Sequence, residues 1–219
     1  MLAASAVYFD RESLRNPQLF ILPTVSTNAQ KKFCDCFNIF VNLKHMKDDK
    51  YHIDIEIDKL TNSIENSISG DSFPTEIHRI EKSDLKNITK TKGWLFNWNE
   101  EAKLKDRLVY KLTILGNPMI VQGLVSISDF QDHIYLHLIE SAPFNLGKHK
   151  LYKGVPGNLF AFACKDSWDK GYEGFVSFTA KTKLIEHYEK SLGATHVGGH
   201  KMIIFPDAAL KLIRKYFNV

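Results

Sequence analysis

The most informative segment of the sequence is Lys148-His-Lys-Leu-Tyr-Lys-Gly154-Val-Pro-Gly-Asn-Leu159, a basic loop that runs directly into a helical pattern. A helix start offers unpaired N–H groups and a positive dipole end, and glycines let the backbone approach a ligand closely. The loop therefore predicts a site for phosphate or pyrophosphate. Gly154 and Gly157 are equally what a tight strand-to-helix turn needs, and both interpretations stay open here. Neither a Walker A sequence nor a Gly-x-Gly-x-x-Gly fingerprint is present.

Downstream of this loop the hydrophobic period is helical, with one face formed by Leu159, Phe160, Ala163, Cys164 and Trp168. A short strand is expected over 173–179, and a second helix that carries Tyr188 ends at Gly193. Two strands over 195–205 and a terminal helix over 207–217 complete the pattern.

Upstream of the loop the period is two, which is typical of strands with one buried face. Strands are expected over 76–80, 107–115, 119–128 and 133–140. The turn residues Gly116-Asn117-Pro118 and 129–132 join the last three strands into an antiparallel meander. Between the first two strands lies an aromatic loop with Trp94, Phe96 and Trp98.

From about Thr75 onward the sequence resembles the GNAT superfamily of N-acetyltransferases. The family signature is Gln/Arg-x-x-Gly-x-Gly/Ala followed by an amphipathic helix, a strand and a second helix with a Tyr-Glu-Lys-x-Gly-Phe-like ending. Here the corresponding residues are 151–159, 175–178 and 187–194, in the same order and with similar spacing. The sequence departs from the signature at Leu151, where Gln or Arg is usual, and at Pro156, where Gly or Ala is usual.

The resemblance implies an α/β (α+β) fold, with a mostly antiparallel, splayed central sheet flanked by helices. It implies acetyl-coenzyme A as cosubstrate, with its pyrophosphate on the backbone of Lys153, Gly154, Val155, Pro156, Gly157, Asn158 and Leu159. The preceding strand end, Leu138-Ile139-Glu140, would diverge from its neighbour and bind the pantetheine amides like an added strand.

Tyr188 lies where family members often keep a tyrosine that protonates the departing thiolate, and it also fits a packing role on its helix face. Glu140 and His137 are the candidate general bases near the strand end. Strict alternation puts these two side chains on opposite faces, and a β-bulge would change which one faces the cleft. The aromatic residues of 93–98 either line the acceptor side of the cleft or close the core.

Residues 1–72 form an N-terminal extension or small subdomain of unknown role, and 73–219 form the GNAT-like domain. The boundary is predicted at the polar run 69–72, because Ser, Gly and Asp favour loops. Within the extension, residues 52–58 alternate isoleucine with polar residues, which predicts a strand with one buried face.

The composition, with 44% hydrophobic and 25% charged residues, is that of a folded globular protein. Three cysteines (Cys34, Cys36 and Cys164) form no disulfide framework or zinc ligand set, which indicates a reducing compartment such as the cytoplasm. His196 and His200 lack a third ligand, so no metal is expected. A net charge of +4 without a concentrated basic face argues against direct nucleic-acid binding, and no apolar run could span a membrane.

The function expected is that of an acyltransferase, which moves an acetyl group from acetyl-CoA to a primary amine by direct attack in a ternary complex. The identity of the acceptor amine is not encoded in any motif, and a homodimer is compatible with the sequence. The alternative is a catalytically weak or inactive GNAT-like, acyl-CoA-binding module that acts through a protein partner. Leu151 and Pro156 are the residues that favour the alternative.

Overall fold

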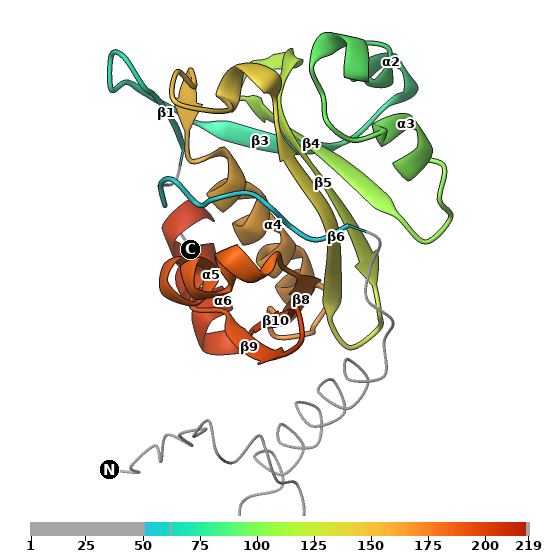
Figure 1. The fold of residues 1–219 in the computed structure, drawn as a ribbon, viewed down its shortest axis with the longest axis vertical. Helices are drawn as coiled ribbons and strands as arrows, with labels where there is room; N and C mark the ends of the chain where they lie inside the picture. The colour runs from blue at the N-terminus through green and yellow to red at the C-terminus, as the bar shows by residue number, and fades with distance from the viewer. Residues whose placement is uncertain (1–50, 62, 218–219) are drawn as a thin grey trace, which may run out of the picture. The chain divides into compact units, whose positions relative to one another are not determined.

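The architecture is a central β-sheet with helices on both faces (Figure 1). The computed structural model describes residues 51–61 and 63–217, and Cys34 and Cys36 lie outside them. The strands are β1 (Ile64–Asn66), β2 (Ser72–Phe73), β3 (Thr75–Arg79), β4 (Leu108–Ile114), β5 (Asn117–Asp129), β6 (Ile134–Ser141), β7 (Tyr152–Lys153), β8 (Val176–Thr179), β9 (Thr195–Gly198) and β10 (Lys201–Ile204). The α-helices are α2 (Lys82–Leu85), α3 (Trp98–Glu101), α4 (Val155–Asp169), α5 (Ile185–Leu192) and α6 (Pro206–Phe217).

The main sheet has the strand order β3-β4-β5-β6-β8-β10-β9. Neighbouring strands are antiparallel except for β6 and β8, which are parallel and are joined by the crossover through α4. The predicted fold class is therefore confirmed, and so is the meander that precedes the signature loop. A second, small sheet has the order β2-β1-β7 and joins residues 64–73 to Tyr152-Lys153 of the loop before α4.

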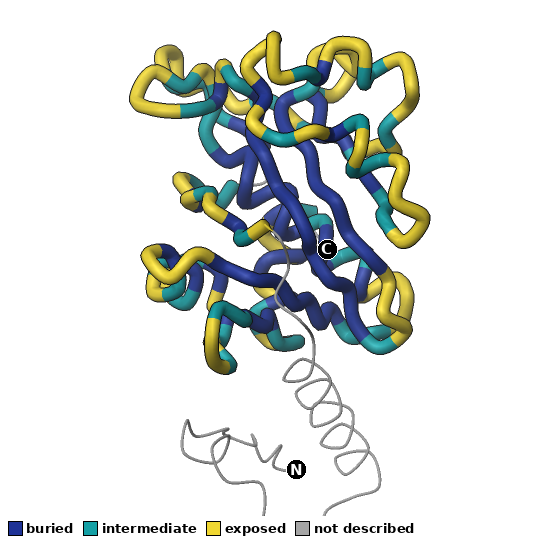
Figure 2. Tube along the Cα trace, turned by 45° about the vertical axis from the view of Figure 1, so that its right-hand side comes forward, coloured by how far each residue is buried: buried dark blue, intermediate teal, exposed yellow. Residues whose placement is uncertain are grey.

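Each face of the main sheet has its own hydrophobic cluster. The larger cluster lies on the side of α4, α5 and α6 and contains Leu136, Phe160, Phe178 and Tyr188. The smaller cluster contains Trp94, Trp98, Leu124 and Leu138 and lies under the segment with α2 and α3. Figure 2 shows the buried central strands passing between exposed loops. On α4 the predicted apolar face is buried at Leu159, Phe160, Ala163 and Cys164, but Trp168 is 43% exposed because it lies in the last turn of the helix.

Residues 51–61 pack with the rest of the described chain in one compact unit. Their expected alternation is present: Ile53 and Ile57 are buried while Asp54, Glu56 and Asp58 are exposed. The segment is nevertheless not a regular strand, because it forms only one isolated parallel bridge, between Ile53 and Ala180. We call residues 51–61 the strap, because it crosses the sheet between β6 and α5 (cyan in Figure 1).

Candidate functional site

The main sheet opens where β6 and β8 diverge. The two strands pair at Ile134↔Val176, Tyr135↔Ser177 and Leu136↔Phe178, and β6 then continues to Ser141. On its other edge β6 stays paired with β5 as far as Ser141. Among the described strands, none pairs with the β8-side edge of β6 after Leu136. That edge can therefore accept an extended, amide-containing ligand as an added strand.

A β-bulge in β6 decides which side chains face this opening. Ser126 pairs with Leu138 and Ile127 pairs with Leu136, so His137 is the extra residue. A bulge shifts the alternation by one residue, and Leu136 and Leu138 accordingly belong to different hydrophobic clusters. His137 is buried, and its Nε2 lies 2.9 Å from Ser128 Oγ. His137 does not line the cavity at the opening, whereas Glu140 does.

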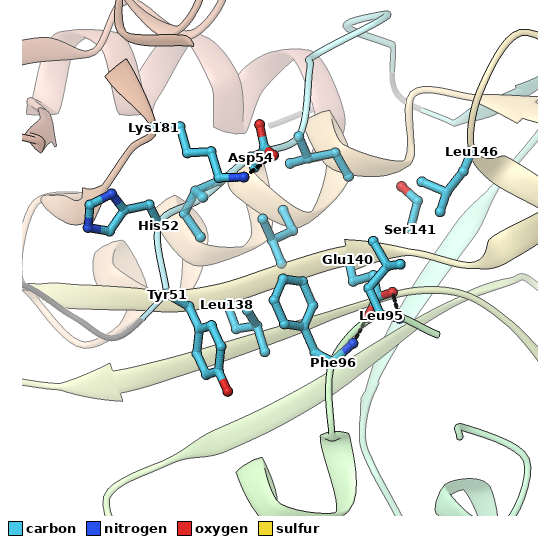
Figure 3. Close-up of a pocket in the computed structure, with 13 residues that line it drawn as sticks. Tyr51, His52, Asp54, Leu95, Phe96, Leu138, Glu140, Ser141, Leu146 and Lys181 are labelled. Atoms are coloured by element: carbon cyan, nitrogen blue, oxygen red, sulfur yellow. Dashed lines mark hydrogen bonds and ion pairs between the residues drawn. The ribbon is translucent and has the colours of Figure 1, made fainter. Parts of the chain in front are cut away.

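Two adjoining cavities follow the free edge of β6. The first, of about 450 Å³, reaches from the strap residues Tyr51 and His52 to Phe96 and Glu140 (Figure 3). The second, of about 430 Å³, reaches the start of α4 at Pro156. The walls of both include Asp54, Ile55, Ser141 and Leu146. Together the cavities form a groove, with β6 as one wall and the strap as the other.

The strap is bound through its backbone to β8 and α5. Ile53 N donates to Thr179 O (2.7 Å), and Lys181 N donates to Ile53 O (3.0 Å). Further along, Ile57 N donates to His187 Nε2 (2.7 Å). The strap thus takes the place of a strand beside β8 in the opening of the sheet.

The N-terminus of α4 is covered by the end of the strap. Gly154 is the N-cap residue with φ 91°, and its N–H donates to Asp58 Oδ1 (2.9 Å). Lys150 Nζ donates to Asp58 Oδ2 (2.8 Å). Lys148 and Lys183 line the same cavity. An anion is the natural ligand of such a helix start, and a carboxylate of the chain itself occupies it.

The two glycines of the signature loop are in contact with the chain itself. A Cβ on Gly154 would lie 3.0 Å from Thr61 Cγ2, and a Cβ on Gly157 would lie 2.0 Å from Tyr216 Oη. Gly157 is therefore required by packing against α6, whatever ligand binds nearby. Asn158 is buried too, and its side-chain amide donates to Ser63 O and Gly154 O.

The remaining residues expected at the cofactor fall into two groups. Leu138, Ile139 and Glu140 line the first cavity, and Pro156 lines the second. Val155 and Leu159 are buried in the larger hydrophobic cluster, and Lys153 lies in β7 opposite Glu65. The lysines and the free β6 edge fit a phosphate-bearing, amide-containing chain such as coenzyme A, although the strap covers the helix start that would hold its pyrophosphate.

Tyr188 is buried on α5 and its hydroxyl is bonded to the strap. The hydroxyl donates to Ile55 O (2.7 Å) and accepts from Ile55 N (3.2 Å). Burial raises the pKa of Tyr188 well above its usual value, and the nearby Asp54 and Glu56 raise it further, although the bond to Ile55 opposes this. The phenol is therefore protonated at neutral pH. The position fits a proton donor and a packing residue alike.

Glu140 joins β6 to the aromatic loop. Its Oε1 accepts from Leu95 N (2.6 Å), and its Oε2 accepts from Trp98 Nε1 (2.6 Å) and Phe96 N (3.4 Å). Burial raises the pKa of Glu140, and these three hydrogen bonds reduce the shift without cancelling it. Trp94 and Trp98 are core residues, while Leu95 and Phe96 face the cavity.

The sequence did not predict that residues of the strap belong to the site. Asp54, Ile55 and Asp58 line the groove, but only the isoleucine alternation over 52–58 hinted that the segment packs on the domain. Among the described residues, no group of three or more potential metal ligands was found. No helix in this part of the chain is both long and apolar enough to cross a membrane.

The sheet combines an antiparallel meander, a bulge in the last strand of that meander, and a crossover helix that leads to a diverging parallel strand. This arrangement is the mixed, mostly antiparallel, splayed sheet flanked by helices that the resemblance to the GNAT superfamily implies.

Comparison with known proteins gives similarity to solved structures alone, since no family model and no curated protein matches the sequence. A spermidine/spermine N-acetyltransferase from Vibrio cholerae is 14% identical, with 63% of this chain and 95% of that chain covered and a TM-score of 0.41. Another structure, described as spermidine N-acetyltransferase from Vibrio cholerae in complex with CoA and spermine, is 14% identical, covering 62% of this chain and 98% of that chain, with a TM-score of 0.40. The ribosomal-protein-S18-alanine N-acetyltransferase from Escherichia coli is 18% identical, covering 59% of this chain and 90% of that chain, with a TM-score of 0.35.

Proposed function

We propose that this chain is an N-acetyltransferase that transfers an acetyl group from acetyl-CoA to a primary amine in a ternary complex. The observation that carries the proposal is the groove along the free edge of β6, which connects the lysine-lined start of α4 with the carboxylate of Glu140. A basic end, an unpaired strand edge and a carboxylate, in that order, match a phosphate group, a pantetheine-like arm and a reacting amine.

Bound acetyl-CoA would supply an acetyl group activated as a thioester. Lys148, Lys150 and Lys183 would hold its phosphates by charge, and the backbone of 138–140 would orient the arm. The amine must lose a proton as the new C–N bond forms, and Glu140, or a water held by it, would accept that proton. The sulfur gains a proton as the C–S bond breaks, and Tyr188, a protonated group whose hydroxyl is bonded to Ile55 of the strap wall, would donate it.

The acceptor end of the groove has an apolar wall with a carboxylate in it. Leu95 and Phe96 face the strap there, and Tyr51 contacts Phe96 with ring centroids 5.4 Å apart. Glu140 supplies negative charge, which favours an acceptor that carries an ammonium group. Small polyamines, lysine side chains and protein N-termini all fit this description.

The proposal is tested by titrating CoA into the chain by calorimetry and by following thiol release from acetyl-CoA with pools of amines. Saturable CoA binding together with amine-dependent thiol release is the expected result. If CoA does not bind at millimolar concentration to the wild type or to variants with a weakened strap, the acetyltransferase proposal is wrong.

A GNAT-like module without activity is the second candidate. It is favoured by Asp58, whose carboxylate accepts the hydrogen bond from Gly154 N–H at the start of α4. The two candidates differ in turnover: the module releases no thiol with any amine, even after the strap is weakened.

A further inference from the structure

We infer that the strap is an internal competitor for the acetyl-CoA site, in which Asp58 takes the position of the pyrophosphate and the backbone at Ile55 holds the hydroxyl of Tyr188. The inference rests on the proposed function, because it concerns access to the same groove. It assigns a role to residues 53–58, for which the sequence indicated no function beyond a buried face.

The first support is the way the strap is bound. Three residues spaced by two, Ile53, Ile55 and Ile57, direct backbone groups to β8 and α5. Hydrogen bonding of an extended chain at an open sheet edge is how strand addition works between proteins. At Ile53 the strap therefore uses the type of contact that a pantetheine arm would use, but on the β8 side of the opening, while Ile55 and Ile57 bond to side chains of α5.

The second support is charge. Three exposed residues of the strap are the acids Asp54, Glu56 and Asp58, and they border a cavity whose cations are Lys148, Lys150 and Lys183. Asp58 pairs with Lys150, and Asp54 pairs with Lys181 and Lys183. A chain with a carboxylate on every second residue fits a groove built for a polyanion.

The third support is the set of groups that the strap blocks. Asp58 accepts the N–H of Gly154, which is the helix-start donor that a phosphate would use. The carbonyl oxygen of Ile55 accepts the hydrogen bond of the Tyr188 hydroxyl, which cannot donate to a sulfur at the same time. One short segment thus engages both the predicted anchoring group and the predicted proton donor of the reaction.

The contacts of the strap are of a kind that a ligand can replace. The side chains of Asp58 and Lys150 keep 16% and 26% of their surface exposed, so their ion pair is accessible to solvent. The ligand would offer phosphate to the same lysine and the same N–H, and a CoA molecule that binds only when the Asp58 end of the strap moves away shifts the population toward the open form. Apparent affinity is then lowered by the small fraction of open molecules.

The test uses the full chain and CoA as the probe. Asp58→Ala removes both contacts to the start of α4, and Glu56→Ala is the matched control, because Glu56 lines the same cavity with the same charge but forms none of the hydrogen bonds or ion pairs described above. We expect calorimetry to give CoA binding about tenfold tighter for Asp58→Ala and less than about threefold tighter for Glu56→Ala. Both acids repel the phosphates of CoA, but only Asp58 also holds the strap to the start of α4 by hydrogen bonds.

Hydrogen–deuterium exchange of the peptide covering 51–61 is the second measurement. The expected result is faster exchange when CoA binds to the wild type, and faster exchange in Asp58→Ala before any ligand is added. Unchanged or slower exchange on CoA binding would show that the strap lines the site instead of competing for it.

The outcomes separate the two proposals. Equal CoA affinity in wild type and Asp58→Ala, or equal gains in Asp58→Ala and Glu56→Ala, overturns the competitor and leaves the acetyltransferase proposal intact. Absence of CoA binding in all three proteins, with the strap shown by exchange to be released in Asp58→Ala, overturns the acetyltransferase proposal itself and with it the competitor.

Discussion

The two walls of the groove each present a carboxylate that accepts several hydrogen bonds, but the two are built differently. Glu140 on β6 is 2% exposed and accepts its hydrogen bonds from Leu95, Phe96 and Trp98 of the aromatic loop. Asp58 on the strap receives one backbone bond and one from the ammonium group of Lys150, which solvent reaches.

The β6 wall is therefore fixed, whereas the contacts of the strap wall can be exchanged. A buried carboxylate that loses its donors carries a large desolvation cost, so Glu140 and the aromatic loop are expected to move as one unit. An accessible ion pair contributes little and can be replaced by another anion. We therefore expect the β6 wall to persist in every state and the strap wall to respond to ligands, as the following predictions test.

The largest expected effect comes from removing the strap wall together with β1. A chain that begins at Tyr51 should fold, whereas a chain that begins at Phe73 loses the buried side chains of Ile53, Ile57 and Ile64. Each is worth about 1.5–3 kcal/mol on burial, which together approaches the total stability of a typical domain. Circular dichroism melting compares the two chains. A cooperative transition for the Phe73 chain, within a few degrees of the longer one, would support the predicted boundary at 72/73 instead.

Tyr188→Phe is expected to slow acetyl transfer and, at the same time, to strengthen CoA binding by weakening the strap. Loss of a positioned acid is expected to lower kcat by about 10²- to 10⁴-fold. The same change removes both hydrogen bonds to Ile55, so CoA should bind several-fold more tightly, measured by calorimetry beside single-turnover rates. A rate within about twofold of wild type, instead of the expected loss, would show that Tyr188 only packs in the core and binds the strap.

Glu140→Gln tests the fixed wall. An amide offers one acceptor oxygen where the carboxylate offers two, so an N–H of Leu95 or Trp98 is left facing an NH₂ group. The expected cost is about 1–3 kcal/mol of unfolding free energy, or about 2–4 °C of Tm for each kcal/mol. Glu100→Gln, at a side chain that is 66% exposed, is the control and should melt like wild type. Equal melting temperatures for Glu140→Gln and Glu100→Gln would show that the hydrogen bonds to Glu140 do not stabilise the fold.

The smallest effect is expected at Asp54 in the strap. Burial raises the pKa of Asp54, but Lys181 and Lys183 outweigh it and hold the pKa below its ordinary value of 3.8. A depressed carboxyl pKa stabilises the fold above pH 3.8, and this contribution disappears as the pH falls through the lower, folded value. Asp54→Asn should therefore cost about 0.2–1 kcal/mol at pH 7 and nothing at the acidic end. Denaturant titrations at several pH values check this, and a pH-independent difference would contradict it.

Much of the fold could be predicted because it depends on local periodicity. The strands β3 to β6 alternate with period two, and the helices α4, α5 and α6 show the helical period, each close to its observed bounds. The β-bulge could be anticipated only as an option, because one extra residue in β6 leaves no mark in the alternation of Tyr135, His137 and Ile139. The candidate residues Glu140 and Tyr188 were found through the family pattern, while their present hydrogen-bond partners were not.

The sequence by itself determined the order of the elements, the glycine-containing start of α4 and the buried face of the strap, since each is a property of neighbouring residues. That the same segment also closes the groove, through Asp58 and Ile55, follows from the tertiary structure alone. Asp58 and Gly154 are 96 residues apart, and Ile55 and Tyr188 are 133 apart. Such contacts form when the whole sheet opens between β6 and β8, and no local pattern specifies which segment of the chain will fill that opening.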